Sequence, residues 1–574
     1  MNRLEQALAY VSQRKSLWFK TLLTGIALYL LWQIALFTLL VLSAENRPFL
    51  LRAVLQTLEI ILVLILVKRI VRAGPTAPEI FERRYLAATW VLFGLWLCVM
   101  VPMGFEIRDP YLYGTANFDP YQHLVIPMIT GFRGYLFAVW LMCGIATLVL
   151  YGVKKRWADV DEVLLPLVCH LIFTGILILV RLGPDRTKTA MIGWNQAVFF
   201  LIGAVAFGII ISPAVRERLM NFADRYPYIL LIITIALIGG TFFFGTALSG
   251  GRKLWYRVGP LTIQPIEISK ILFVYVVAAF LEKKAYTFQK SRRLSSLISL
   301  GVMCLSLFLV LLLQKDLGPI MVLVIVCLWM FVSVSGRIDL LATALLAIGT
   351  VIGLAFWFKQ PSMVYHRIMD FVDPLQYSSQ MTYALWTQAS GDLWGTALGM
   401  SRAYKVPVIE SDYIFTAILA EKGWIGAAVV LTVFWAFSIR GIQLARFLVK
   451  GHSRDATFMM GVVMVLFVQQ VVIVAGNLNM LPLSGLTLPF VSAGGSSLVV
   501  NLGVLALMLG LVARHTRPAQ ITETGQVKSI PMPIAAANPT RVEPEFEPSV
   551  RDDEMVLGGR AFRAGSAVKP GGHA

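Results

Sequence analysis

Carboxylate and basic side chains stand beside several apolar stretches of this chain, where they could act on a charged substrate. Asp412 is one such group, because it lies where a polar stretch turns into a long apolar run. Its carboxylate could abstract a proton there, or it could cap a helix by accepting hydrogen bonds from free backbone amides. Glu421 and Lys422 follow about 13 Å deeper along a helix axis, where we expect Glu421 to be paired for structure.

Basic and aromatic residues gather in the polar stretch 249–257. Three cations and two aromatic residues stand there: Arg252, Lys253, Arg257, Trp255 and Tyr256. This mixture suits an anionic headgroup, because Arg and Lys bind phosphate oxygens while Trp and Tyr lie at the membrane interface. A hydrated loop with an aromatic anchor is the alternative interpretation.

Two further motifs place acidic residues at the ends of apolar stretches. Glu267 and Lys270 are three positions apart, so they share one face of a helix and could form an ion pair or contact a substrate. Asp316 lies in a tight turn and could simply cap the following helix. Both motifs therefore have a structural interpretation beside the functional one.

The segment 481–497 combines residues that break regular backbone with several hydroxyl side chains, including Ser492 and Ser496. Irregular backbone near membrane depth must line a cavity or be buried in protein. Gly494 and Gly495, just before an apolar run, could present amide groups to a phosphate. All these motifs are predicted to lie on the same side of a membrane.

The composition indicates a membrane protein. Hydrophobic residues make up 57% of the 574 and charged residues only 14%, against about 25% charged in soluble domains. The net charge is +18, but no basic run with interleaved aromatics is present, which excludes nucleic-acid binding. The five cysteines show no CxxC spacing and are interpreted as small hydrophobic core residues; they are Cys98, Cys143, Cys169, Cys304 and Cys327.

The apolar runs predict an all-α integral membrane protein. A bilayer core of about 30 Å needs about 20 apolar residues of helix. On that basis we expect about fourteen transmembrane helices. Their predicted extents are 18–43, 50–70, 86–105, 132–152, 163–182, 192–212, 228–248, 264–282, 296–314, 318–335, 340–358, 413–438, 457–478 and 495–513.

The basic residues predict the orientation. They collect in the clusters 68–84, 154–156, 216–225 and 283–293, which all fall on the cytoplasmic side if both termini are cytoplasmic. Two larger loops, 106–131 and 359–412, then lie outside. The tail 515–574 is rich in proline, small residues and mixed charge, so we expect it to be disordered.

Seven motifs, taken in chain order, resemble those of the SEDS family (shape, elongation, division and sporulation), the RodA, FtsW and SpoVE type of bacterial cell-wall polymerase. They are Gly251–Trp255 for its GARRW, Gln264–Glu267 for its QPSE, Gln314–Gly318 for its QPDLG, and then Arg367–Pro374, Gly395–Gly399, Pro407–Asp412 with Ala420–Gly423, and Leu488–Ser497. This sequence departs from the family pattern at Ile266, Lys315, Val408 and Ala493.

The resemblance covers ten predicted spans, 161–514, and implies a peptidoglycan glycosyltransferase that polymerises lipid II on the outer face of the bacterial plasma membrane. Asp412 matches the family's required carboxylate and would be the catalytic base. The residues expected to bind substrate are Arg252, Lys253, Trp255, Glu267, Lys270, Asp316, Arg367, Lys405, Ser492 and Ser496. The expected partners are lipid II, membrane lipids and a class B penicillin-binding protein. No metal cage is evident, and assistance by Mg²⁺ or Mn²⁺ stays open.

Residues 1–160, with four predicted helices, are not covered by the resemblance. Within them, Arg52 and Glu59 lie seven positions apart on one helix face and are interpreted as binding neighbouring residues rather than substrate. Two other functions remain for the whole chain. A flippase for lipid-linked sugars would need headgroup contacts on both membrane faces, and a non-enzymatic scaffold for a penicillin-binding protein would not need Asp412.

Overall fold

The structure is a computed structural model. It describes residues 47–72, 79–100, 132–183, 191–247, 253–259, 261–290, 294–359, 362–396, 398, 400–449, 453–516, 519–521 and 527–530. The chain separates into two units, Met1–Ile534 and Ala535–Ala574, and the second lies wholly outside the described residues. The predicted span 18–43 and the predicted outer loop 106–131 also lie outside them.

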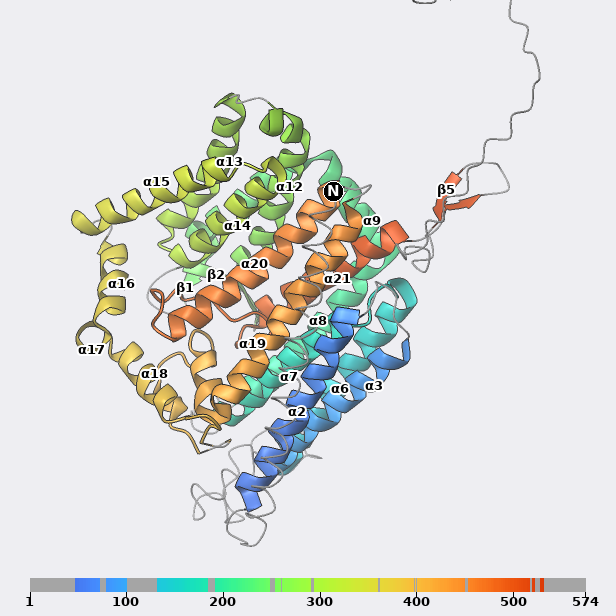
Figure 1. Cartoon of the computed structure of the whole chain (residues 1–574), viewed down its shortest axis with the longest axis vertical. Coiled ribbons are helices and arrows are strands. Elements are labelled where there is room, and N and C mark those ends of the chain that lie inside the picture. Colours follow the sequence, from blue (N-terminus) through green and yellow to red (C-terminus); the bar gives the residue numbers. More distant parts are fainter. Residues whose placement is uncertain are drawn as a thin grey trace, which may run out of the picture. The chain divides into compact units, whose positions relative to one another are not determined.

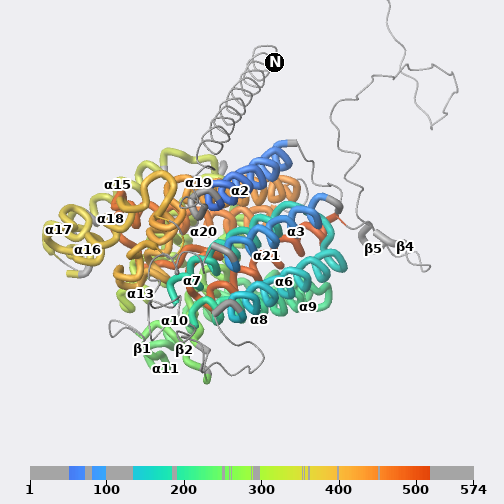
Figure 2. The backbone as a smooth tube through the Cα atoms, turned by 90° about the horizontal axis from the view of Figure 1, so that it is seen from below, coloured from blue at the N-terminus to red at the C-terminus, as the bar shows by residue number. Residues whose placement is uncertain are grey.

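The described part of the N-terminal region consists of helices that pack on one another (Figures 1 and 2). They are α2 (Arg47–Arg72), α3 (Glu79–Leu95) with its π-helical continuation η2 (Trp96–Met100), and α6 (Phe132–Trp157). Trp90 and Trp140 join α3 to α6, because their rings stack with centroids 4.1 Å apart. Each indole N–H also donates to the other residue's backbone carbonyl, at 3.2 and 3.1 Å.

The following part of the chain is a bundle of long apolar helices. They are α7 (Leu164–Leu182), α8 (Ile192–Ile211), α10 (Pro227–Gly239), α12 (Pro265–Lys290), α13 (Leu294–Leu313), α14 (Leu317–Ser335), α15 (Ile338–Trp357), α19 (Ile414–Leu448), α20 (Ser453–Asn477) and α21 (Gly495–Thr516). Two shorter helices, α9 (Pro213–Arg225) and α11 (Thr241–Phe244), connect them. Every residue of α7 is buried, so this helix lies at the centre of the packing.

Eight helices in the described residues are long and apolar enough to cross a membrane, and the chain is a multi-pass membrane protein. These eight helices include α7, α8, α14, α19, α20 and α21. Two shorter apolar segments, Ile298–Leu313 and Leu341–Val351, accompany them. The helices α2 and α12 carry charged residues along their described parts and are not among the eight. The predicted number of fourteen spans therefore stays a prediction.

The predicted outer loops contain regular structure that the apolar pattern did not indicate. A three-stranded antiparallel sheet is formed by β1 (Thr246–Ala247), β2 (Lys253–Val258) and β3 (Leu261–Ile263). The loop 359–412 contains α16 (Ser362–Val372), α17 (Pro374–Tyr377), α18 (Ser379–Ala389) and the 3-10 turn η4 (Ala403–Lys405). Two short strands, β4 (Ala519–Ile521) and β5 (Val527–Ile530), lie in the segment predicted to be disordered.

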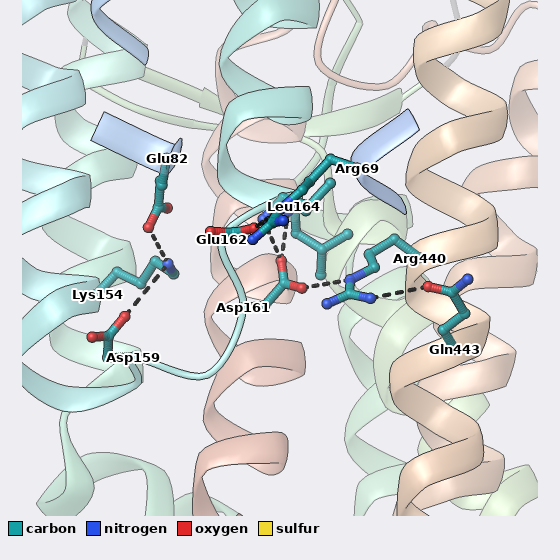
Figure 3. A network of polar contacts seen from close by, with 10 residues as sticks. Arg69, Glu82, Lys154, Asp159, Asp161, Glu162, Leu164, Arg440 and Gln443 are labelled. Carbon is teal, nitrogen blue, oxygen red and sulfur yellow. Dashed lines mark hydrogen bonds and ion pairs between the residues drawn. The ribbon is translucent and has the colours of Figure 1, made fainter. Parts of the chain in front are cut away.

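Ion pairs around the start of α7 join it to α19 and attach α2 to the bundle (Figure 3). Asp161, just before α7, accepts hydrogen bonds from the backbone amides of Val163 and Leu164 at 2.8 and 2.7 Å. Its other carboxylate oxygen lies 2.6 Å from Nε of Arg440 on α19. Arg69 of α2 pairs with the neighbouring Glu162 at 2.5 Å, so one end of α2 is fixed to the start of the bundle.

Candidate functional site

A cavity of about 550 Å³ lies where α12, α14 and α16 approach the chain around residue 411 and the irregular segment 483–497. Among the residues that the structure describes, five charged side chains stand on its wall, four acidic and one basic. They are Glu267, Asp316, Asp370, Asp412 and Arg367. Leu254, Leu486 and Trp255 add apolar surface. The cavity therefore offers both polar and apolar contacts to a ligand.

Asp412 is half-buried and lies two residues before α19, whose N-cap is Tyr413 with no side-chain capping bond. The capping interpretation is therefore wrong for this helix start. The backbone of Asp412 is held at both ends, because its N–H donates to the Val408 carbonyl at 3.2 Å and its carbonyl accepts from Asn477 Nδ2 at 2.8 Å. The Ser411 hydroxyl donates to Oδ1 of the Asp412 carboxylate at 2.8 Å. These bonds fix a carboxylate on the cavity wall.

Arg367 and Asp412 face the same point of the irregular segment. A Cβ built on Gly485 would lie 3.7 Å from Asp412 Oδ2 and 3.8 Å from Arg367 Nη2. The guanidinium of Arg367 also donates to the Leu483 carbonyl. Gly485 has φ of 71°, a left-handed conformation that favours glycine. The guanidinium of Arg367 and the carboxylate of Asp412 therefore both lie close to the turn that the backbone makes at Gly485.

A second polar group lies at the start of α12. Glu267 and Lys270 form the predicted ion pair at 3.0 Å, and Lys270 also donates to Gln469 Oε1 at 2.7 Å. Glu267 accepts a further bond from the Ser497 hydroxyl at 3.1 Å. Lys270 is 2% exposed and is not part of the cavity wall, whereas Glu267 is. Lys270 therefore balances the negative charge of Glu267 from within the protein, on the side away from the cavity.

Ser492 fastens the irregular segment to the chain beside Asp412. Its hydroxyl accepts from the Leu488 amide at 2.9 Å and donates to the Ser411 carbonyl at 2.6 Å. Ser492 is buried and does not line the cavity. The Gly494 amide donates to Gln196 of α8 at 3.3 Å, so it is engaged within the protein rather than presented to a phosphate.

The other predicted residues fall into three groups. Trp255, Asp316 and Ser496 lie on the cavity wall, and Asp316 stands at the N-cap of α14 without a side-chain capping bond, so capping is not its role. Lys253 on β2 and Lys405 on η4 are exposed and are not part of the described wall. Arg252 lies outside the described residues. Their contact with a substrate stays a prediction.

Asp370 is a cavity residue that sequence reasoning missed. It lies on α16 three positions after Arg367, and that spacing on one helix face was the signal that could have found it. Burial raises the pKa of Asp370, while the positive charges of His366 and Arg367 act in the opposite direction. Gln380 and Thr487 were also missed as wall residues.

The described residues of the cavity wall lie in a part of the chain that matches a known protein family. The family model of FtsW, RodA and SpoVE, described as a cell cycle protein, matches residues 161–517. The chain belongs to this family. Its match begins at the residue whose carboxylate fixes the start of α7, and it includes every described residue of the cavity wall. Residues 1–160 lie before the match.

Several relatives carry names for their activity. The peptidoglycan glycosyltransferase RodA of Mycobacterium tuberculosis is 28% identical over 70% of this chain and 88% of its own length. The probable peptidoglycan glycosyltransferase FtsW of Shewanella sediminis is 28% identical over 64% of this chain and 90% of its own. Stage V sporulation protein E of Bacillus subtilis is 30% identical over 50% and 77%.

A solved structure supports the fold. A chain from a peptidoglycan synthase complex that coordinates polymerization and crosslinking superposes with a TM-score of 0.52 and is 24% identical. It covers 61% of this chain and 96% of its own length. The all-α membrane architecture of this FtsW/RodA/SpoVE family member is therefore confirmed.

Proposed function

We propose that this family member is a peptidoglycan glycosyltransferase that polymerises lipid II, in the synthesis of the cell wall for shape or division. The observation that carries the proposal is the position of Asp412, a carboxylate held on a polar cavity wall with Arg367 facing the same glycine. The names of the relatives agree with this chemistry.

Asp412 acts as the general base. Its carboxylate accepts the proton of a GlcNAc hydroxyl while that oxygen forms a bond to the anomeric carbon of the donor MurNAc. The bond from the anomeric carbon to the diphosphate oxygen breaks, and undecaprenyl diphosphate leaves with the electron pair. The hydrogen bond from Ser411 holds the carboxylate in orientation for this transfer. The hydroxyl proton ends on Asp412.

The leaving diphosphate gains negative charge in the transition state, so a fixed cation beside it lowers the barrier. Arg367 supplies that cation, and no general acid is needed because diphosphate is already a good leaving group. Within the described residues, no group of three or more His, Cys, Asp or Glu side chains could hold a metal ion. Whether Mg²⁺ or Mn²⁺ assists the transfer is tested by adding each ion to the assay.

We propose that the cavity opens to the outer face and that both termini are cytoplasmic. The distribution of basic clusters along the sequence supports this orientation. We also propose a class B penicillin-binding protein as partner, because a structurally similar chain belongs to a complex that joins polymerization to crosslinking. Lipid II and membrane lipids are the other expected partners.

Purified protein with labelled lipid II, assayed with and without its penicillin-binding protein, tests the proposal. We expect wild type to form polymer. The polymerisation rate of Asp412→Ala should be lower by a factor of about 10² to 10⁴. Polymer from Asp412→Ala at the wild-type rate would remove Asp412 from its role, and no polymer from wild type under either condition would support a scaffold. Transfer of labelled lipid II across a vesicle membrane, without polymer, would support a flippase.

A further inference from the structure

Helix α2 of the N-terminal region presents three buried polar residues on one face. Arg52, Gln56 and Glu59 are spaced by four and three positions, and they are 6%, 1% and 3% exposed. Buried polar and charged groups destabilise a protein unless they find partners. Their partners show what this face of α2 does.

This polar face of α2 packs against a point in α19 where the helix is interrupted. Gly423 has φ of 68° and ψ of −173°, which interrupts the helix one turn after Ala420. The loop 391–396 crosses the break: the Thr396 amide donates to the Ala420 carbonyl at 2.8 Å, and the Trp424 amide donates to the Asp392 carbonyl at 3.2 Å. A Cβ on Gly423 would lie 2.3 Å from the Gly395 nitrogen, so the two backbones touch.

The α2 face binds both sides of this crossing. Arg52 donates to the Gly395 carbonyl at 2.8 Å, and Gln56 donates to the Lys422 carbonyl at 2.9 Å. Both carboxylate oxygens of Glu59 lie 2.7 Å from the Lys422 ammonium nitrogen. The same ammonium lies 5.1 Å from the Trp96 ring centroid, which places the pair against the N-terminal helices on a second side. Helix α2 thus holds the loop and the broken helix together.

The loop held by α2 continues directly from the helix that supports Asp412. Gln388, in the last turn of α18, donates to Thr416 Oγ1 and to the Asn477 carbonyl, both at 2.8 Å. Asn477 in turn donates to the Asp412 carbonyl at 2.8 Å. A shift of the loop 391–396 would therefore displace α18 and, through Gln388 and Asn477, the backbone that carries the proposed base.

We propose that Arg52, Gln56 and Glu59 are positioning residues for the Asp412 site, so that the N-terminal helix α2 is a structural component of the catalytic apparatus. This inference rests on the proposed function. It gives a role to a helix that lies before the family match. The contact is built from one ion pair and backbone hydrogen bonds, so it fixes geometry rather than only adding packed apolar area.

Glu59→Gln tests the proposal, with Glu82→Gln as its matched control. Glu82 of α3 is buried and lies 2.6 Å from Lys154 of α6, so it forms an equally buried pair in the same region without touching the crossing. Glu59→Gln removes the carboxylate from the buried Lys422 ammonium, whereas Glu82→Gln leaves the buried Lys154 ammonium with only the exposed Asp159 carboxylate, 4.0 Å away. Both variants should lower the melting temperature. We expect only Glu59→Gln to lower kcat, on the order of tenfold, with KM changed less than twofold. Arg52→Lys should keep more activity than Arg52→Gln.

Hydrogen exchange gives a readout that does not depend on polymerisation. The amides of Thr396, Trp424 and Asp412 should lose protection in Glu59→Gln and retain it in Glu82→Gln. Wild-type kcat together with unchanged protection in Glu59→Gln would overturn the positioning role. An inactive wild type would count against the proposed function alone, because the exchange comparison would still decide whether α2 holds the loop.

Discussion

Glu59 of α2 and Lys422 of α19 form a buried ion pair across 363 residues of sequence. Helix α2 is also fixed near its other end, where Arg69 binds Glu162. The positions of Arg52 and Arg69 are separated by about 26 Å of helix, close to the thickness of a bilayer core. The N-terminal helix is therefore attached to the family core at two widely separated points along its length.

Ser411→Ala should slow polymerisation about 10- to 100-fold without abolishing it. The change removes the hydroxyl that donates to Asp412 Oδ1, and a hydrogen bond to a charged group contributes about 1.5 to 3 kcal/mol. Steady-state rates with labelled lipid II measure the effect. Ser411→Thr keeps the hydroxyl and should stay near wild type, so equal loss in both variants would speak against this role.

Arg367→Gln should reduce the rate by about 10² or more, because it removes the cation that faces the proposed diphosphate position. Arg367→Lys should recover only part of the activity, since a lysine lacks the forked donors of a guanidinium. Arg402→Gln is the control, because Arg402 is exposed on the same outer segment and is not part of the described wall. Equal rates for the two glutamine variants would remove Arg367 from the mechanism.

Gly423→Ala should destabilise the protein and lower its yield of folded material. The residue has φ of 68°, and an added Cβ would approach backbone atoms of the crossing loop within 2.3 to 2.5 Å. Gly301→Ala is the control, because that helical glycine has open space around it and alanine favours a helix by about 1 kcal/mol. Melting temperatures in one detergent compare them, and a stable Gly423→Ala would contradict the tight crossing.

Asp161→Asn should lower stability by about 3 to 5 kcal/mol, because it leaves the buried guanidinium of Arg440 without its carboxylate. A second change, Arg440→Gln, should recover part of that loss by removing the uncompensated charge. Thermal unfolding of the two single variants and the double variant forms a complete cycle. Strictly additive losses would mean that the pair does not couple α7 to α19.

Asp370→Asn should change stability in a pH-dependent way. Burial raises the pKa of Asp370 above the value of about 3.9 expected in an unfolded chain, so the folded protein binds more protons in the window above that value. Wild-type stability must then fall as pH rises through this window, whereas the asparagine variant is spared that loss. We expect its melting temperature relative to wild type to be higher at pH 7 than at pH 4. Equal offsets at both values would refute the expectation.

The sequence predicted the long helices well, because membrane thickness fixes the length of an apolar run. The predicted span 495–513 is α21, and the predicted span 318–335 is α14. It also indicated that Glu421 is paired, and the structure places Arg181 of α7 at 2.7 Å from it. These features depend on local composition or on the cost of a buried charge, which are both visible in one sequence.

Contacts between distant helices could not be predicted in the same way. Nothing in the spacing of Glu59 specifies Lys422 as its partner, because that choice depends on which faces of two helices meet. Asp370 was missed because residues 359–412 were predicted as a loop, so the amphipathic pattern of α16 was not used to place it on one face with Arg367. The engaged amide of Gly494 likewise depends on Gln196, a residue 298 positions away.

The attachment of α2 to a helix made much later has a consequence for biogenesis. Ribosomes synthesise the chain from its N-terminus, so α2 enters the bilayer long before Gly395 and Lys422 emerge. During that interval the charges of Arg52 and Glu59 must be solvated by water, paired with lipid headgroups or bound by an insertion chaperone. We therefore expect a stage in biogenesis at which the nascent protein is open to misfolding and degradation, which ends only when Lys422 has been inserted and pairs with Glu59.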